Sequence, residues 1–230
     1  MSKLIIQPFE RPFETESGAV LPNPEIAYQS WGTLNSAKDN VVFICHALTG
    51  NTAADEWFGG LIGSGKAIDP EKHFIICPNI LGSCYGSSGP TAIQPETGKP
   101  YQANFPDITI RDIVRFHQRL LNHLQIAGIE LIIGGSLGGM TALEFSLMDE
   151  RIKAAALFAM GKAHTPWAIG ISEAQRMAVY ADENWNGGFY DEKHPPKKGL
   201  AAARAMAMIT YRSPQNYTQK FGRSFHSEDK

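Results

Sequence analysis

The stretch LIIGGSLGGMTALE, residues 131–144, decides the fold. An apolar run leads into a Gly-x-Ser-x-Gly pattern centred on Ser136, and residues that favour a helix follow it. A serine on a sharp strand-to-helix turn is held with its hydroxyl above the edge of a sheet, where it can act as a nucleophile. Gly134 and Gly138 are then required, because a Cβ at either position would collide with neighbouring backbone. The alternative interpretation is a glycine-rich turn whose serine only caps the helix.

A nucleophilic serine needs two amide donors for the negative charge that develops on the reacting oxygen. The first is the N–H of Leu137, at the positive end of the helix that begins just after the serine. The second should follow an earlier strand of the same sheet. The sequence HALTG, residues 46–50, directly follows the apolar run that ends at Cys45, so we expect the N–H of Leu48 to be this donor. His46 is expected to be a turn histidine, because a general base in this arrangement comes last in the chain.

Short apolar runs and one long helical pattern alternate along the first part of the chain. Apolar residues from Ile110 to Leu124 recur at three-and-four spacing, and Thr109 with Asp112 predicts a capping box at the start of this helix. This alternation predicts the α/β class, with a mostly parallel sheet and helices on both faces. The predicted strands are residues 26–31, 41–45, 74–77, 131–133 and 154–158.

After about residue 165 the pattern changes to segments rich in Ala and Met, without a further buried strand. Helices are predicted over residues 172–181 and 198–211. We therefore divide the chain into an N-terminal core, residues 1–165, and a helical insertion or lid, residues 166–230.

The composition excludes several classes of function. The chain has 230 residues, of which 43% are apolar and 19% charged, as in ordinary globular proteins. A net charge of -2 provides no basic surface for nucleic acid or for an anionic membrane. The sequence contains no apolar run of about 18 residues, the length that spans a membrane, and its N-terminus does not resemble a signal peptide. Three cysteines without a CxxC pair predict reduced thiols, so we expect a cytoplasmic setting.

Two kinds of binding site are considered and set aside. Residues 60–67, GLIGSGKA, nearly match a phosphate-binding loop, but Ala67 lacks the hydroxyl that would ligate Mg²⁺. Seven histidines are scattered without the spacing of metal ligands. We therefore predict neither a nucleotide site nor a metal.

A series of sequence blocks, in order along the chain, resembles the homoserine O-acetyltransferase family of the α/β-hydrolase superfamily. The blocks are residues 46–50, 65–69, 79–90, 95–100, 109–112, 134–140 and 209–213. The resemblance implies an α/β-hydrolase-type fold and transfer of an acetyl group from acetyl-CoA to the hydroxyl of L-homoserine, a step of methionine biosynthesis. Ser136 would be acylated and then deacylated by homoserine. Acetyl-CoA is a co-substrate in this scheme, and no other cofactor is implied.

The resemblance also implies a substrate site. Arg204 would hold the homoserine carboxylate with its planar guanidinium. Tyr211, seven residues further on, would lie on the same helical face, and Thr49 would line the pocket. Without the resemblance, Arg204 is interpreted as a solvated helix residue and Thr49 as a simple turn residue. A homodimer through the helical insertion is implied as well.

The chain departs from the family after the helical insertion. The family's histidine base and orienting carboxylate lie on loops after the last two strands of the sheet, and no such strands are predicted here. Three histidines follow Ser136, namely His164, His194 and His226, and none of them follows a predicted strand directly enough to serve as the base. We therefore expect a C-terminally truncated member with little activity, since loss of a triad member costs about 10⁴-fold in rate.

Three alternatives stay open. The chain could be a non-catalytic or split-chain fragment that completes its sheet with a partner supplying the Asp and the His. It could be a serine esterase or hydrolase, with water as the acceptor. It could also transfer a succinyl group or acylate serine, because a few pocket residues decide the acyl donor and the acceptor.

Overall fold

The structure, a computed structural model, describes residues 3–222. The chain divides into two compact units, Met1–Lys162 and Ala163–Lys230. No helix among the described residues is both long and apolar enough to cross a membrane.

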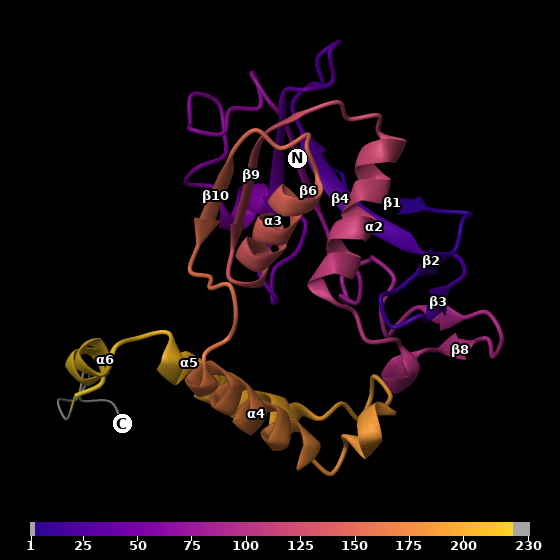
Figure 1. Cartoon of the computed structure of the whole chain (residues 1–230). Helices are drawn as coiled ribbons and strands as arrows, with labels where there is room; N and C mark the ends of the chain where they lie inside the picture. The colour runs from indigo at the N-terminus through magenta and orange to yellow at the C-terminus, as the bar shows by residue number, and fades with distance from the viewer. Residues whose placement is uncertain (1–2, 223–230) are drawn as a thin grey trace. The chain divides into compact units, whose positions relative to one another are not determined.

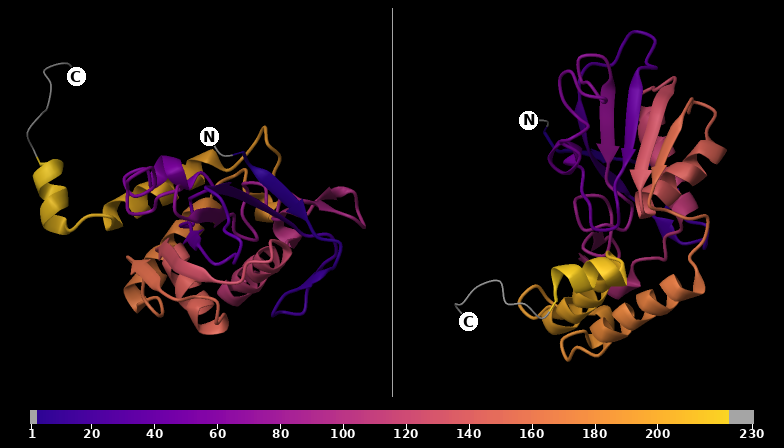
Figure 2. Two further views of the ribbon diagram at one scale, coloured as in Figure 1. Left: turned by 90° about the horizontal axis from the view of Figure 1, so that it is seen from above. Right: turned by 90° about the vertical axis from the view of Figure 1, so that its left-hand side faces the viewer.

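The first unit is built on a six-stranded sheet with the order β1-β4-β6-β5-β9-β10. The four strands from β6 to β10 in this order are parallel to one another, whereas β1 and β4 are antiparallel to their neighbours. The predicted α/β class and mostly parallel sheet are thus confirmed (Figures 1 and 2). The strands are β1 (Ile5–Pro8), β4 (Glu25–Trp31), β5 (Val41–Cys45), β6 (Phe74–Pro78), β9 (Ile129–Gly135) and β10 (Ala155–Phe158).

The strands of this sheet send alternate side chains to two separate clusters, one on each face. On one face Phe43 packs with Val114 and Phe145, which come from the two long helices that lie over the sheet in Figure 1. On the other face Ile44 packs with Ala54 of a short helix. Strands buried on both faces explain the continuous apolar runs of the sequence. The helices of the first unit are α1 (Ala54–Trp57), α2 (Ile110–His123) and α3 (Leu137–Met148).

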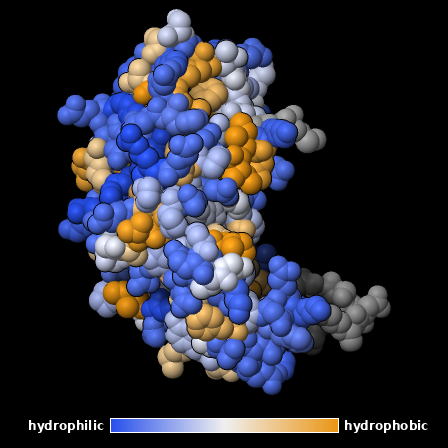
Figure 3. Space-filling model, turned by 90° about the vertical axis from the view of Figure 1, so that its right-hand side faces the viewer, coloured by the Kyte–Doolittle hydropathy of each residue, from blue (hydrophilic) through white to orange (hydrophobic). Residues whose placement is uncertain are grey.

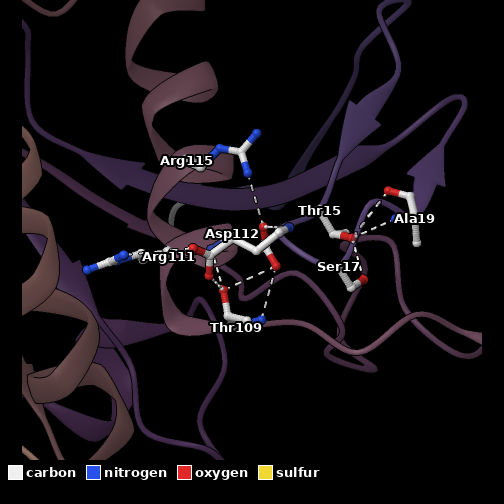
Figure 4. Close-up of polar contacts among 8 residues, drawn as sticks. Thr15, Ser17, Ala19, Thr109, Arg111, Asp112 and Arg115 are labelled. Carbon is white, nitrogen blue, oxygen red and sulfur yellow. Dashed lines mark hydrogen bonds and ion pairs between the residues drawn. The ribbon is translucent and has the colours of Figure 1, made fainter.

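The start of α2 confirms the predicted capping box. The Thr109 hydroxyl accepts a hydrogen bond from the N–H of Asp112 at 3.1 Å, and the Asp112 carboxylate accepts the N–H of Thr109 at 3.2 Å. The same carboxylate accepts the N–H of Glu16 at 2.9 Å and contacts Arg115 at 3.3 Å (Figure 4). Asp112 therefore caps α2 and also joins the N-terminal hairpin to it.

On the face drawn in Figure 3, apolar side chains form separate small patches among polar ones.

Short elements complete the first unit. The short elements are β2 (Phe13–Glu14) paired with β3 (Val20–Leu21), β7 (Ile93–Gln94) paired with β8 (Lys99–Pro100), and the 3₁₀ turn η1 (Gln102–Asn104).

The second unit is helical, as its composition predicts. Helices α4 and α5 pack together through small residues: a Cβ on Gly199 would lie 2.5 Å from the carbonyl oxygen of Ala178, and Ala203 and Ala207 are buried on the same side of α5. The elements are α4 (Pro166–Tyr180), η2 (Asn186–Gly188), α5 (Lys197–Thr210) and α6 (Pro214–Lys220).

The structure differs from the sequence predictions at one helix start and at several elements that were not predicted, β1 and α6 among them. Helix α4 begins at Pro166 and not at residue 172, because the Thr165 hydroxyl accepts the N–H of Ala168 and the proline fits the first helical position. Strand β1 was not predicted, since it is a half-exposed edge strand that relies on antiparallel pairing with β4. Helix α6 was also not predicted, although Ser213 caps it and Pro214 opens it.

Candidate active site

Ser136 lies on a strained bend between β9 and α3. Its backbone has φ 55° and ψ -122°, a region that side-chain-bearing residues rarely adopt. The Ser136 N–H donates to the carbonyl of Phe158 at 3.0 Å, and the Ser136 carbonyl accepts the N–H of Met140 at 3.0 Å. The residue is exposed and its hydroxyl makes no capping hydrogen bond to α3. The bend is therefore held from both sides while the hydroxyl is left available.

The glycines on either side of Ser136 allow backbone to pack directly against backbone. A Cβ on Gly134 would lie 2.3 Å from the carbonyl oxygen of Gly138. A Cβ on Gly138 would lie 2.1 Å from the carbonyl oxygen of Cys45 and 2.7 Å from that of His46. Both distances are far inside contact range, so the glycines are required by the close approach, as the motif predicts. The same contacts place the start of α3 directly against the end of β5.

The predicted amide donors lie on these two abutting segments. Leu137 is the first residue of α3, and Leu48 lies in a turn closed by a 2.8 Å hydrogen bond from the Gly50 N–H to the Ala47 carbonyl. Neither the Leu137 N–H nor the Leu48 N–H has a hydrogen-bond partner among residues 3–222. The turn follows β5, whose last residue is in register with Gly134 of β9. Two unpaired donors thus occur at the carboxyl ends of neighbouring strands.

Thr49 and the Leu48 side chain are exposed on the same turn. His46, in contrast, is only 1% exposed. Its Nδ1 lies 2.8 Å from the Ala47 carbonyl oxygen and its Nε2 lies 3.0 Å from Asn79 Oδ1. Burial lowers the pKa of His46, although its two hydrogen bonds act in the opposite direction. These contacts agree with a buried turn histidine and not with a base for Ser136.

None of the later histidines within the described region is hydrogen-bonded to the Ser136 hydroxyl. His164 belongs to the second unit and is exposed. His194 is also exposed, and its Nδ1 lies 3.1 Å from the carboxylate of Asp191, three residues earlier in the same loop. His226 lies outside the described residues.

The two predicted substrate residues belong to the second unit. Arg204 is exposed on α5, and Tyr211, the residue that ends this helix, is 64% exposed. Thr49 and Ser136 belong to the first unit. The roles assigned to Arg204, Tyr211 and Thr49 remain predictions.

A cavity of about 370 Å³ in the first unit was not predicted from the sequence. Leu137 lines it together with Gly82, Phe105 and Ile108. The lining comes from three loops, the 3₁₀ turn η1 and the first turns of α2 and α3, so no single stretch of sequence signals it. Among residues 3–222 no group of three or more His, Cys, Asp or Glu side chains could hold a metal ion.

The family model described as the alpha/beta hydrolase fold matches residues 40–228, and the chain belongs to this family. The resemblance to homoserine O-acetyltransferases is confirmed by sequence relatives of that name. The protein from Trichormus variabilis (strain ATCC 29413 / PCC 7937) is 56% identical over 215 residues, which are 93% of this chain and 60% of the relative. That from Nostoc punctiforme (strain ATCC 29133 / PCC 73102) is 53% identical, over 95% of this chain and 62% of the relative. The chain thus spans about 60% of the length of these relatives.

Solved structures agree with this family. The homoserine O-acetyltransferase from Bacillus anthracis superposes with a TM-score of 0.89 at 27% identity, covering 99% of this chain and 65% of that one. A mutant of esterase E22 superposes with a TM-score of 0.88 at 29% identity, covering 100% of this chain and 67% of that one. A transferase and an esterase therefore share this architecture.

Proposed function

We propose that this chain carries the nucleophile half of a homoserine O-acetyltransferase, with Ser136 as the residue that is acetylated. The observation that carries the proposal is the exposed serine on its strained bend, beside the unpaired amides of Leu48 and Leu137. The 56% identity to a homoserine O-acetyltransferase supports the choice of reaction.

The reaction divides into two acyl transfers. In the first, Ser136 Oγ bonds to the thioester carbonyl carbon of acetyl-CoA, the C–S bond breaks, and CoA leaves as a thiol with the serine's proton. In the second, the homoserine hydroxyl bonds to the acetyl carbon, the ester bond to Ser136 breaks, and the proton of that hydroxyl returns to Oγ. The amides of Leu48 and Leu137 would donate to the oxyanion in both steps.

Both steps need a base near Ser136. No histidine among residues 3–222 is hydrogen-bonded to that hydroxyl. We infer that further polypeptide supplies a histidine and an orienting carboxylate, and that the chain of residues 1–230 alone turns over slowly. Loss of a triad member costs about 10⁴-fold in rate.

The acceptor would be selected by the second unit. We propose that residues 166–230 of this unit act as a lid. Arg204 would pair with the homoserine carboxylate, Tyr211 would lie beside it, and Thr49 of the first unit would line the pocket. We also propose that the second unit forms a homodimer, since it exposes several large apolar side chains. These include Trp167, Met177, Leu200 and Ile209.

Thiol release from acetyl-CoA, measured with and without L-homoserine, tests the proposal. We expect slow acetylation of Ser136, seen as an acetyl adduct by mass spectrometry, and an adduct that homoserine removes. Ser136→Ala should abolish the adduct. Acetylation that persists in this variant would overturn the proposed function. Turnover within about a thousandfold of a full-length relative would instead overturn the inferred loss of the base.

A second candidate is a serine esterase, which the superposition on esterase E22 supports. The two functions differ in the acceptor. If water removes the acetyl group from Ser136 as fast as homoserine does, the esterase is favoured, and Arg204 has no acceptor to bind.

Replacing acetyl-CoA by succinyl-CoA in the same assay distinguishes the two acyl donors.

A further inference from the structure

Three buried polar residues, His46, Asn79 and His117, form a cluster that contacts the turn carrying Leu48 through His46. Their exposed fractions are 1%, 0% and 1%. His46 follows β5, Asn79 follows β6, and His117 lies on α2. Buried polar groups are costly unless they are hydrogen-bonded, so the protons of this cluster must be arranged to suit one another.

The two backbone carbonyls in the cluster fix which ring nitrogens carry protons. His46 Nδ1 lies 2.8 Å from the Ala47 carbonyl oxygen, which can only accept, so Nδ1 is the protonated nitrogen. His117 Nε2 lies 3.4 Å from the Asn79 carbonyl oxygen, so on the same argument its proton is on Nε2. Burial lowers the pKa of both rings, that of His117 to about 3, which keeps them neutral. The two histidines are therefore opposite tautomers.

The tautomer of His46 decides how the Asn79 amide is oriented. A neutral His46 with its proton on Nδ1 has a bare Nε2, which needs a donor. Asn79 Oδ1, 3.0 Å from this nitrogen, cannot donate, while Asn79 Nδ2 is buried without a partner. The oxygen and nitrogen of an amide are assigned from the hydrogen-bond network and not seen directly. Exchanging them gives Nε2 a donor and removes the orphaned Nδ2.

The His46 ring also shapes the turn itself. The Ala47 carbonyl oxygen accepts one hydrogen bond from His46 Nδ1 and another from the N–H of Gly50, each at 2.8 Å. A Cβ on Gly50 would lie 3.0 Å from His46 Cβ and 3.2 Å from its Nδ1, so the turn is folded closely around the ring. Leu48 is the second of the four residues of this turn.

We propose that His46 is a positioning residue that sets the Leu48 amide of the oxyanion hole, and that Asn79 holds His46 in the required tautomer by donating through Nδ2. His117 supports the arrangement by binding the Asn79 carbonyl. The assignment of Leu48 to the oxyanion hole rests on the proposed function, whereas the tautomers and the amide orientation do not.

Nuclear magnetic resonance of the ¹⁵N-labelled chain tests the proton arrangement without any activity. At neutral pH we expect His46 in the Nδ1–H form, His117 in the Nε2–H form, and a coupling partner for His46 Nε2 in the Asn79 amide. Asn79→Asp keeps the shape of the side chain, and its ionised carboxylate can only accept, so both nitrogens of His46 should carry protons where this carboxylate is ionised. A His46 proton on Nε2 in the original chain would overturn the tautomer assignment.

Two substitutions of His46 separate its two hydrogen bonds. The amide nitrogen of an asparagine can take the place of Nδ1 as a donor, and the amide oxygen of a glutamine can take the place of Nε2 as an acceptor. His46→Asn therefore keeps the bond to the Ala47 carbonyl, while His46→Gln keeps only the link to Asn79. We expect His46→Gln to slow acetylation of Ser136 by p-nitrophenyl acetate at least tenfold, since losing an oxyanion donor costs about 10²–10³ in kcat. His46→Asn should stay within about threefold of the original rate.

The matched controls are His123→Asn and His123→Gln, because His123 is exposed on α2, away from the cluster. Circular dichroism establishes that each variant is folded. Equal rates for the two His46 variants would refute the positioning role. If the original chain shows no acetylation that depends on Ser136, the proposed function fails, and the tautomer measurement still tests this inference.

Discussion

Ser136 and Arg204, the two residues on which the proposed reaction most depends, lie in regions that are built differently. The bend at Ser136 is fixed by backbone alone, through two hydrogen bonds and two glycines that admit no side chain. Arg204 lies on the exposed side of α5 and makes no hydrogen bond or ion pair within residues 3–222. The nucleophile is thus preorganised within the first unit, whereas the choice of acceptor would rest on one solvated side chain of the second.

The largest expected effect separates these two roles. Ser136→Ala should remove acetylation by acetyl-CoA, a loss of about 10⁴-fold or more. Arg204→Ala should leave the rate of acetylation unchanged and raise the homoserine concentration needed for deacetylation about 10- to 100-fold, since a charge-assisted hydrogen bond is worth about 1.5–3 kcal/mol. Mass spectrometry of the acetyl adduct, before and after homoserine is added, measures both steps. If Arg204→Ala slows acetylation as strongly as deacetylation, the division of roles is wrong.

Backbone packing at the bend predicts the next largest effect. Gly138→Ala would place a Cβ 2.1 Å from a carbonyl oxygen that belongs to the central strand β5. Since neither segment can move without disturbing the sheet, we expect a loss of about 3 kcal/mol in the free energy of unfolding. Urea denaturation measures it. An unchanged midpoint together with normal acetylation would show that the close approach is not required.

The buried cluster predicts a pH dependence of the stability that comes from a histidine and not from a carboxyl group. Burial lowers the pKa of His117 from 6.5 to about 3, so the folded chain binds fewer protons than the unfolded chain in that interval. The resulting stability is complete above pH 6.5 and is lost as the pH falls toward 3. His117→Leu should make this slope shallower in urea denaturation between those limits, leaving the contributions of His46 and of the carboxyl groups whose pKa values are also lowered. A slope as steep in His117→Leu as in the original chain would contradict the assignment.

The smallest effect is expected at a glycine without close neighbours. A Cβ on Gly170, in the middle of α4, would meet nothing within 4 Å. Gly170→Ala should therefore raise the free energy of unfolding by about 0.4–1 kcal/mol, because alanine favours the helix. Thermal denaturation followed at 222 nm, the usual helix signal, gives the sign. A loss of stability would mean that the space beside Gly170 is used by a contact in solution.

The sequence predicts well what local chemistry decides. The serine bend, its glycines and the capping box of α2 each depend on residues a few positions apart, and each forms as expected. Strand β1 was missed because it depends on pairing with β4, and the start of α4 was misplaced although Thr165 and Pro166 signal it. The cluster of His46, Asn79 and His117 could not be foreseen, because its members come from three elements that only the folded sheet brings together.

The hydrogen bond from the Ser136 amide to the Phe158 carbonyl has a consequence for how reactivity is controlled. Phe158 is the last residue of β10, which is one of the two edge strands of the sheet among the described residues. Fraying of this border strand would release one anchor of the bend and let the serine relax into an ordinary backbone conformation. A strand that pairs with β10 would therefore also stabilise the strained backbone conformation of Ser136. Completion of the sheet and preorganisation of the nucleophile would then occur together.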